Sequence, residues 1–311
     1  MNNRDCAKLL LTHEDILIVT HKNPDGDTAA SAAALCSALR RGGRRAWVFP
    51  NLQMSRKLMR FCEKYFAPPD YRPKYVVAVD VADAKLLCEG FAGKVDLCID
   101  HHPSNTHYAG QSLVHHERAS CAEVVMEIIK TMNADLTKEE ATLLYIGLAT
   151  DTGCFQYGNT DAAAFRAAAE LVRAGAENAE INVLFFRKVS AARIRLESMI
   201  YDGIRLYRGG TIAVATVTLE MLRESGAAED DLDDLASLAG RCETSVVNIT
   251  IREKEDGSCR VSVRSLEEVN SCAICAVFGG GGHAQAAGCT VEGSPEHVRE
   301  LLVRVTEELW K

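Results

Sequence analysis

Acid and imidazole groups gather most densely in one short segment, His21-Lys22-Asn23-Pro24-Asp25-Gly26-Asp27. The apolar run Ile16–Val19 before it predicts a buried strand, and the alanine-rich run Thr28–Arg41 after it predicts a helix. One histidine and two aspartates would then stand on a tight turn at the carboxyl end of a strand, where open α/β sheets bind their ligands. Imidazole and carboxylate groups at this spacing favour a divalent metal such as Mn²⁺ over zinc in a thiolate site.

The same kinds of group recur after three more predicted elements. Two apolar runs, residues 75–79 and 95–99, predict buried strands, and the capping box at residues 137–140 predicts the start of a helix. The groups that follow these elements are Asp80, Asp100, His101, His102 and Asp151. Because the carboxyl ends of parallel strands meet at one edge, we expect a crowd of carboxylates that repel one another without cations. Two metal ions would relieve that repulsion and lower the pKa of a water between them.

The elements that must position these groups alternate between strand and helix over the first half of the chain. This pattern predicts an α/β protein whose N-terminal domain, residues 1–185, contains a doubly wound parallel sheet. Residues 179–200 contain no glycine or proline and predict one long helix, which gives a helical connector over residues 186–205. Strand patterns and a final helix then predict a smaller α/β domain over residues 206–311.

Two features of the second domain have alternative interpretations. Four consecutive glycines, residues 279–282, precede His283 and could form a tight loop, or could expose backbone N–H groups to a phosphate. The entropy that four glycines lose on folding favours the second interpretation. Arg264 ends an alternating strand pattern, and it is either a surface arginine or an arginine that pairs with phosphate.

Composition limits the classes of function. The net charge is −8 and the pI is about 5.7, which does not suit a protein that grips long duplex nucleic acid. No apolar run is long enough to span a membrane and no export signal is visible, so we expect a cytoplasmic protein without a membrane partner. The twelve cysteines are scattered, and only Cys272 and Cys275 form a close pair, so we expect reduced thiols rather than a zinc site.

The acid and imidazole segments resemble, in order, the four motifs of the DHH phosphoesterase family. The matching residues are His21-x-Asn23-Pro24-Asp25-Gly26-Asp27, Asp80, Asp100-His101-His102 and Asp151. The second domain is similar to the C-terminal domain found in one branch of that family, through Arg264, the Gly279–His283 run and Ala286-Ala287-Gly288. The resemblance covers nearly the whole chain. It points to the nanoRNase branch, whose members cleave oligoribonucleotides and dephosphorylate 3′-phosphoadenosine 5′-phosphate.

The resemblance implies a role for each of these residues. His21 and Asp25 would hold one Mn²⁺, Asp27, His101 and Asp151 would hold the other, and Asp80 would bridge both; Mg²⁺ or Co²⁺ could substitute. His102 would face the scissile phosphate, and Asp100 would orient His101. Arg264, Gly280, Gly281, Gly282 and His283 would hold the nucleotide from the second domain, which places the active site in a cleft between the two domains.

The expected function is therefore a phosphodiesterase in which two metals activate a bridging hydroxide. Its substrates would be short oligonucleotides, dinucleotides such as pApA, and nucleoside 3′,5′-bisphosphates. The alternative is hydrolysis of cyclic di-AMP or other dinucleotides, and a RecJ-type single-strand exonuclease is disfavoured because no basic groove is evident. A non-catalytic nucleotide-binding protein would not need every one of the expected metal ligands. A homodimer is compatible with these expectations.

Overall fold

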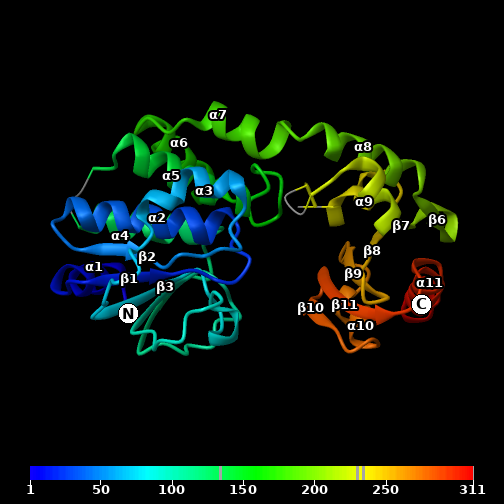
Figure 1. Ribbon diagram of the computed structural model, residues 1–311, viewed down its shortest axis with the longest axis horizontal. Helices are drawn as coiled ribbons and strands as arrows, with labels where there is room; N and C mark the ends of the chain where they lie inside the picture. The colour runs from blue at the N-terminus through cyan, green and yellow to red at the C-terminus, as the bar shows by residue number, and fades with distance from the viewer. Residues whose placement is uncertain (133–134, 229–230, 233–234, 311) are drawn as a thin grey trace. The chain divides into compact units, whose positions relative to one another are not determined.

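A computed structural model describes residues 1–132, 135–228, 231–232 and 235–310. The chain divides into two compact units, Met1–Lys188 and Val189–Lys311, each with its own sheet (Figure 1). The division falls inside the predicted connector at residues 186–205. Within the described residues, no helix combines the length and the apolar character that crossing a bilayer requires.

The first unit is built on a parallel sheet of five strands within the described residues, in the order β2-β1-β3-β4-β5. The strands are β1 (Ile16–Val19), β2 (Ala46–Val48), β3 (Tyr75–Val79), β4 (Leu97–Asp100) and β5 (Gln111–Val114). Ile16 pairs with Ala46 on one side and with Tyr75 on the other, so β1 is a central strand. The order of connection reverses between β1 and β3, and sheets of this order bind ligands at that switch point.

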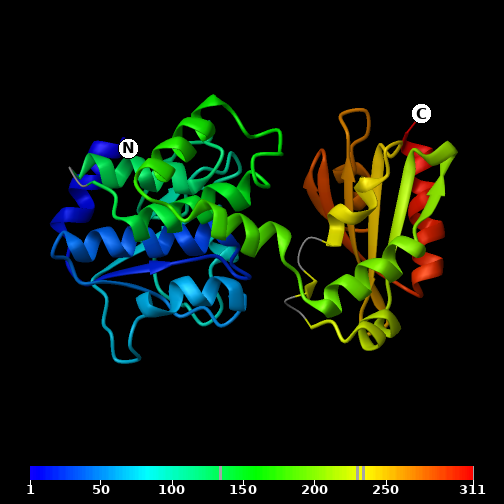
Figure 2. The same ribbon diagram turned by 90° about the horizontal axis from the view of Figure 1, so that it is seen from above.

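Helices cover one face of this sheet (Figures 1 and 2). They are α1 (Asn3–Thr12), α2 (Gly26–Arg41), α3 (Arg56–Cys62), α4 (Cys121–Thr131), α5 (Lys138–Asp151), α6 (Ala162–Arg173) and α7 (Asn178–Asn182). Ile18, Val79 and Ile99 point from the strands into the same buried cluster as Leu35 of α2 and Leu144 of α5. The small side chains of α2, mostly alanine, allow α5 to pack closely over it.

Loops rather than helices cover the other face of the sheet. Leu17 and Val76 lie there in a cluster with Phe91 and Tyr108, which come from the segments before and after β4. The crossover between β3 and β4 contains only a 3₁₀ turn, Ala84–Leu86, among its regular elements. The predicted parallel α/β sheet is therefore confirmed. Helices cover only one of its faces, and the crossover between β3 and β4 lacks the helix that the sequence predicts there.

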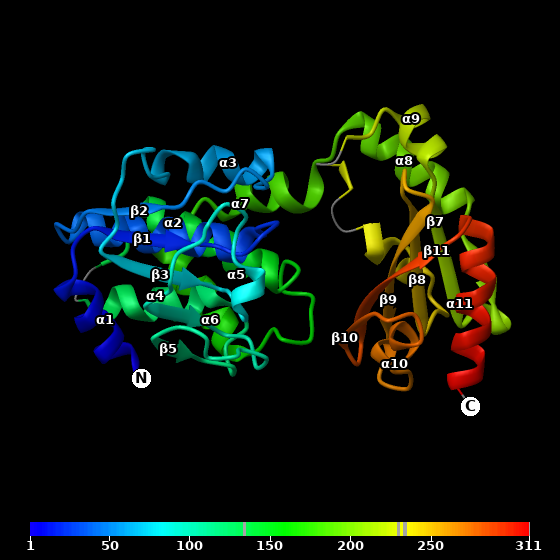
Figure 3. The ribbon, with the colours of Figure 1, turned by 60° about the horizontal axis from the view of Figure 1, so that its bottom comes forward.

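The second unit contains a mixed sheet of six strands within the described residues, in the order β10-β11-β9-β8-β7-β6. Its elements are α8 (Ala191–Asp202), β6 (Arg205–Tyr207), β7 (Ile212–Val217), α9 (Leu219–Ser225), β8 (Val247–Glu253), β9 (Ser258–Ser265), α10 (Ser271–Ala276), β10 (Gly281–His283), β11 (Ala286–Glu292) and α11 (Pro295–Leu309). Only β7 and β8 pair in parallel. Helices α10 and α11 pack on one face (Figure 3). Helix α8 and the 3₁₀ segment Leu235–Arg241 pack on the other face over β7.

The prediction of one continuous helix over residues 179–200 is wrong, because the structure has two helices there with a break between them. Helix α7 passes into a π-helical turn, Val183–Arg187, and the chain becomes extended at Lys188 (φ −95°, ψ 126°). Ser190 then begins α8, because its hydroxyl accepts a hydrogen bond from the Arg193 N–H. A serine cap therefore restarts the helix where no glycine or proline marks a break.

Candidate metal centre

The segment after β1 turns the chain so that His21 and Asp25 face each other. The Asn51 side chain holds the turn by donating to the His21 carbonyl oxygen at 2.9 Å. The Asp25 side chain begins α2, because its Oδ1 accepts from the N–H groups of Asp27 (3.0 Å) and Thr28 (3.1 Å). The same oxygen lies 3.6 Å from His21 Nε2. Asp25 thus combines the helix-capping role open to any carboxylate here with a position beside the imidazole.

Asp27 lies at the N-terminus of two helices. It sits in the first turn of α2, is 1% exposed, and its two oxygens accept from the N–H groups that open α4, Cys121 (2.6 Å) and Ala122 (2.9 Å). Ser31 donates a third hydrogen bond at 3.1 Å. Because helix N-termini carry partial positive charge, they stabilise a buried carboxylate at this point. The bonds also fix where its oxygens point.

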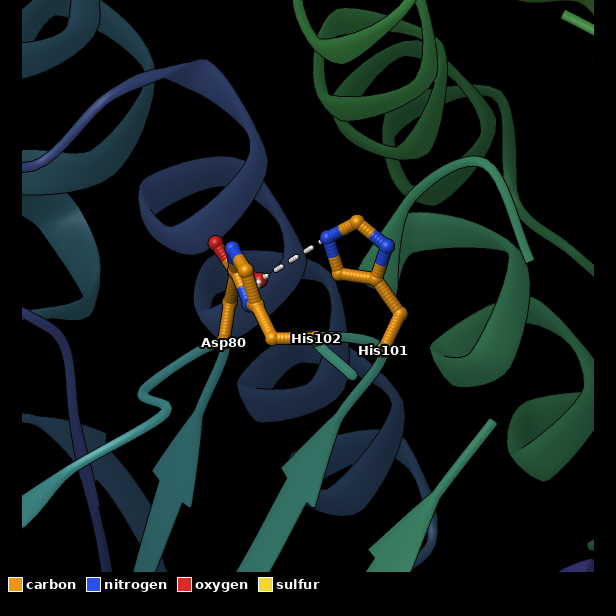
Figure 4. A group of neighbouring side chains, drawn as sticks. All are labelled: Asp80, His101 and His102. Atoms are coloured by element: carbon orange, nitrogen blue, oxygen red, sulfur yellow. Dashed lines mark ion pairs between the residues drawn. The ribbon is translucent and has the colours of Figure 1, made fainter. Parts of the chain in front are cut away.

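Asp80 comes directly after β3 and lies between the two histidines. Its Oδ1 is 3.5 Å from His101 Nε2, and its Oδ2 is 3.9 Å from His21 Nε2. Figure 4 shows the His101 ring turned toward this carboxylate from the end of the neighbouring strand. Asp80 is 2% exposed, and its Oδ1 and His101 Nε2 are buried without a hydrogen-bond partner in the described structure. Such unsatisfied buried atoms are compatible with ligands of a metal ion.

Backbone carbonyls fix the same tautomer in both histidines. The Nδ1 of His21 lies 2.8 Å from the Lys22 carbonyl oxygen, and the Nδ1 of His101 lies 3.1 Å from that of Arg118. A carbonyl can only accept, so each Nδ1 carries a proton, and in a neutral ring Nε2 carries a lone pair. Both lone pairs face carboxylates. Two acceptors that face each other need a proton or a metal cation between them, and a cation in this position is the usual arrangement of metal-binding imidazoles.

Burial, and then the charges of neighbouring carboxylates, raise the pKa values of three of these aspartates. Burial, and then the charges of Asp27, Asp25, Asp100 and Asp151, raise the pKa of Asp80 well above its usual range. Loss of solvation and the charges of Asp27 and Asp25 raise the pKa of Asp151 to about 8. The pKa of Asp27 is raised as well, chiefly by burial. Without cations, this site therefore holds its negative charges at a cost in free energy.

Three overlapping groups of side chains in the described residues have metal-ligand spacing. Within each group the ligand atoms lie within 4.8 Å of one another, which is near the roughly 4–5 Å that two ligands on opposite sides of one divalent cation can span. The groups are His21, Asp25 and Asp80; Asp27, His101 and Asp151; and Asp80, His101 and His102. The first two groups contain the residues that the family resemblance assigns to the two ions, and Asp80 also occurs in the third, beside His101; the assignment itself stays a prediction. No cysteine belongs to them, and oxygen and imidazole ligands suit Mn²⁺ or Mg²⁺.

Asp100 holds His102, which differs from the expected contact with His101. Its Oδ1 accepts from His102 Nδ1 at 2.8 Å and from the His101 backbone N–H at 2.7 Å, while Arg118 supplies the contact to the His101 ring. The side chain of Asn105 donates to Asp100 Oδ2 at 2.6 Å. The hydrogen bond that His102 donates to Asp100 raises the pKa of His102. No motif in the sequence indicates Asn105 or the Arg118 carbonyl.

The predicted nucleotide-binding residues lie in the second unit. Arg264 is exposed on β9, and Gly281–His283 form β10, paired antiparallel to β11. A Cβ atom at Gly280 would lie 2.3 Å from the Gly288 carbonyl oxygen. A Cβ at Gly282 (φ +144°) would lie 2.5 Å from that of Ala286, so close packing explains two of the glycines. Gly281 has open space around it, and its role in binding stays a prediction, as does the cleft between domains.

Two family models match the chain, one in each unit. The model of the DHH family, N-terminal domain, matches residues 15–148, and the model of the DHHA1 domain matches residues 209–311. The first match includes every proposed metal ligand except Asp151. The second includes Arg264 and the glycine run.

Comparison with individual proteins gives the same result. The chain is 34% identical to the bifunctional oligoribonuclease and PAP phosphatase NrnA of Thermus thermophilus, over 94% of this chain and 90% of that protein. Its fold is similar to that of an exopolyphosphatase-related protein of Bacteroides fragilis, with a TM-score of 0.88 and 23% identity over 98% of this chain and 96% of that chain. RecJ of Thermus thermophilus, solved with Mn²⁺, aligns with a TM-score of 0.55 and 15% identity, over 99% of this chain and 54% of RecJ.

Proposed function

Since this chain belongs to the DHH family, we propose that it is a metal-dependent phosphodiesterase that hydrolyses short oligonucleotides to mononucleotides. The relative in Thermus thermophilus is named for oligoribonuclease and PAP phosphatase activities together. We therefore propose pApA and other short RNAs as substrates, with 3′-phosphoadenosine 5′-phosphate as a further one.

The observation that carries this proposal is the position of Asp80 between two imidazoles whose Nε2 atoms both lack protons when neutral. His21 and Asp25 would hold one divalent cation, the group of Asp27, His101 and Asp151 would hold the second, and Asp80 would contact both. When bound, such a pair of cations supplies a water-derived nucleophile at neutral pH and neutralises charge on the phosphate. We propose Mn²⁺, the ion solved with RecJ, with Mg²⁺ or Co²⁺ as substitutes.

The chain's own residues then bind and orient the phosphate and manage a proton. His102 donates its Nδ1 hydrogen to Asp100, and the raised pKa favours a ring that also carries a proton on Nε2. That proton can be donated to a phosphate oxygen, because the His102 side chain is 37% exposed and not fully enclosed. In the second unit, the Arg264 guanidinium would donate two hydrogen bonds to two oxygens of one phosphate. Gly280–His283 would offer backbone N–H groups and the His283 imidazole as further donors.

Asp80→Asn tests the proposed metal pair, because it keeps the shape of the side chain and removes the shared charge. Asp161→Asn is the matched control: Asp161 begins α6 through hydrogen bonds to Ala163 and Ala164, and asparagine caps helices equally well. Turnover of bis(p-nitrophenyl) phosphate and pApA is measured with Mn²⁺, together with bound metal. We expect Asp80→Asn to lose nearly all of both, and the control to lose neither. Normal metal content and turnover in Asp80→Asn would refute the proposal.

A substrate panel distinguishes the alternatives within the family. It compares pApA, a longer RNA, cyclic di-AMP and 3′-phosphoadenosine 5′-phosphate under identical Mn²⁺ conditions. The proposed function requires the largest kcat/KM for pApA or another short oligonucleotide. A larger kcat/KM for cyclic di-AMP would establish the alternative, and processive degradation of the longer RNA would indicate a RecJ-type activity.

A further inference from the structure

One face of the second unit's sheet carries basic and small side chains in a regular row. Along β9, Cys259, Val261 and Val263 point into the core beneath α10 and α11, so the alternate residues point to the opposite face. These alternate residues are Arg260, Ser262 and Arg264. In the strand register Gly288 of β11 lies opposite Ser262, and Thr290 lies opposite Arg260.

A groove of about 760 Å³ follows this row. Its floor is low because Gly288 has no side chain and its neighbours Ser262 and Ala286 are small. Phe278 and the first glycines of the 279–282 run form part of its wall. A volume of this size accommodates a ligand larger than a single small anion, since ligand pockets measure roughly 300–1,000 Å³.

Three cations line the groove, namely Arg264, Arg260 and Lys254, which lies in the turn between β8 and β9. In the part of the chain that the structure describes, none of the three forms an ion pair. Glu292, on the same face of β11, lies opposite Ser258 rather than Arg260. Exposed arginines that border a groove without acidic partners leave their N–H groups available to an anionic ligand.

We infer that this groove binds the chain of an oligonucleotide, and that Arg260 and Lys254 contact a phosphate beyond the one assigned to Arg264. Arg264 lies four positions after Arg260, which places the two about 13 Å apart along the strand. Two arginines at that separation contact two different phosphates more readily than they contact the same phosphate. Phe278 packs against the core of the second unit and is half-buried, so the part of its ring that lines the groove can contact a base. The inference rests on the proposed function and extends it, because it makes Arg260 a residue that selects substrates by length.

The test compares substrates of two lengths. The variants are Arg260→Gln and the double variant with Lys254→Gln, and the control is Arg304→Gln, an exposed arginine of α11 outside the groove. The measurement is kcat/KM for pApA and for a 5′-phosphorylated five-residue oligoadenylate. Arg260→Gln should lose about tenfold on the longer substrate and less than about twofold on pApA, because only the longer chain reaches the second contact. The control should lose neither.

Binding separates this inference from the proposed activity. Fluorescence anisotropy of a labelled five-residue oligoadenylate is measured on Asp80→Asn, with and without Arg260→Gln, over a range of salt concentrations. We expect weaker binding and a salt dependence reduced by about one phosphate contact when Arg260 is absent. Equal losses on both substrate lengths, or no loss on either together with unchanged binding, would overturn the inference. If the wild type hydrolyses no phosphodiester but binds the oligoadenylate through Arg260, the proposed function fails while the groove remains.

Discussion

Gly147 of α5 controls the position of a proposed metal ligand, and replacing it by alanine should weaken metal binding. A Cβ atom at Gly147 would lie 2.7 Å from Asp27 Oδ1, 2.8 Å from the Ala122 Cβ and 3.3 Å from the Ser31 hydroxyl. Ordinary van der Waals contact begins at 3.4 Å. The new Cβ and the carboxylate must therefore move apart by roughly 0.7 Å, through a shift of either α5 or Asp27, whereas a functional site tolerates displacements of about 0.5 Å.

Asp27 cannot accommodate the methyl group by rotating freely. Its oxygens are held by the N–H groups of Cys121 and Ala122, and Ser31 occupies the remaining side. A shift of the carboxylate breaks these bonds, so we expect α5 to be displaced from α2 instead. Alanine is favoured over glycine in a helix by about 1 kcal/mol, while overpacking costs about 1–3 kcal/mol. The free energy of unfolding should then fall by about 0–2 kcal/mol.

Metal affinity is the more sensitive measurement. Changes to groups that orient metal ligands cost about 10–100-fold in affinity, and we expect that range for Gly147→Ala. The assay is Mn²⁺ titration by calorimetry, with urea unfolding in EDTA to measure stability separately. Gly158→Ala is the matched control, because a Cβ atom there meets nothing within 4 Å. An Mn²⁺ affinity in Gly147→Ala within about twofold of the wild type would refute the reasoning.

Three further predictions concern stability, proton transfer and the metal itself. Glu140→Ala should lower the free energy of unfolding by about 3 kcal/mol with metal affinity unchanged, because the fully buried Glu140 carboxylate pairs with Arg41 at 3.0 Å; a loss under about 1 kcal/mol in urea would contradict this. Asp100→Asn should lower kcat about 10–100-fold and keep the bound metal, because it removes the charge that supports the His102 proton; loss of metal would instead assign Asp100 to the metal site. Adding Mn²⁺ to the EDTA-treated protein at about 1,000 times its Kd should raise the Tm of the first unit by about 10 °C, whereas Asp80→Asn should show almost no increase; an equal increase in both would contradict a shared ligand.

The meeting of these acid and imidazole groups at one edge of the sheet could be predicted because the physics that places them is local, while their roles as metal ligands stay a prediction. His21, Asp80 and Asp100 each end a short apolar strand, and parallel strands deliver their ends to one edge. What orients them could not be predicted in the same way. The acceptors for the Nδ1 atoms of His21 and His101 are backbone carbonyls, and a carbonyl belongs to every residue type. Asp100 was expected to orient His101 and instead holds the adjacent ring.

The missed elements have physical causes as well. Strand β5 was not predicted, because its residues are mostly half-exposed or exposed and do not alternate clearly between apolar and polar. The start of α8 was not predicted, because a serine cap rather than a glycine or proline marks it. The glycine run shows how one composition serves two needs. The entropy that four glycines lose on folding favours ligand binding, yet Gly280 and Gly282 are required by the close approach of β11, whereas a Cβ at Gly279 or Gly281 would meet nothing within 4 Å. The sequence alone could not show which glycines of the run are needed for packing, because the strand that packs against them, β11, comes later in the chain.

The close packing of α2 against α5 also determines where the side chains of the candidate metal centre lie. A Cβ at Gly26 would lie 2.3 Å from the Thr150 hydroxyl, just as one at Gly147 would strike Asp27. Gly147 of α5 therefore leaves room for Asp27 of α2. Gly26 of α2 leaves room for Thr150 of α5, which immediately precedes Asp151. The glycine between Asp25 and Asp27 thus has a packing role in addition to any freedom it gives the turn. Substitutions at either glycine should disturb the site without replacing any proposed ligand, because the distance between the helices sets the distance between the carboxylates.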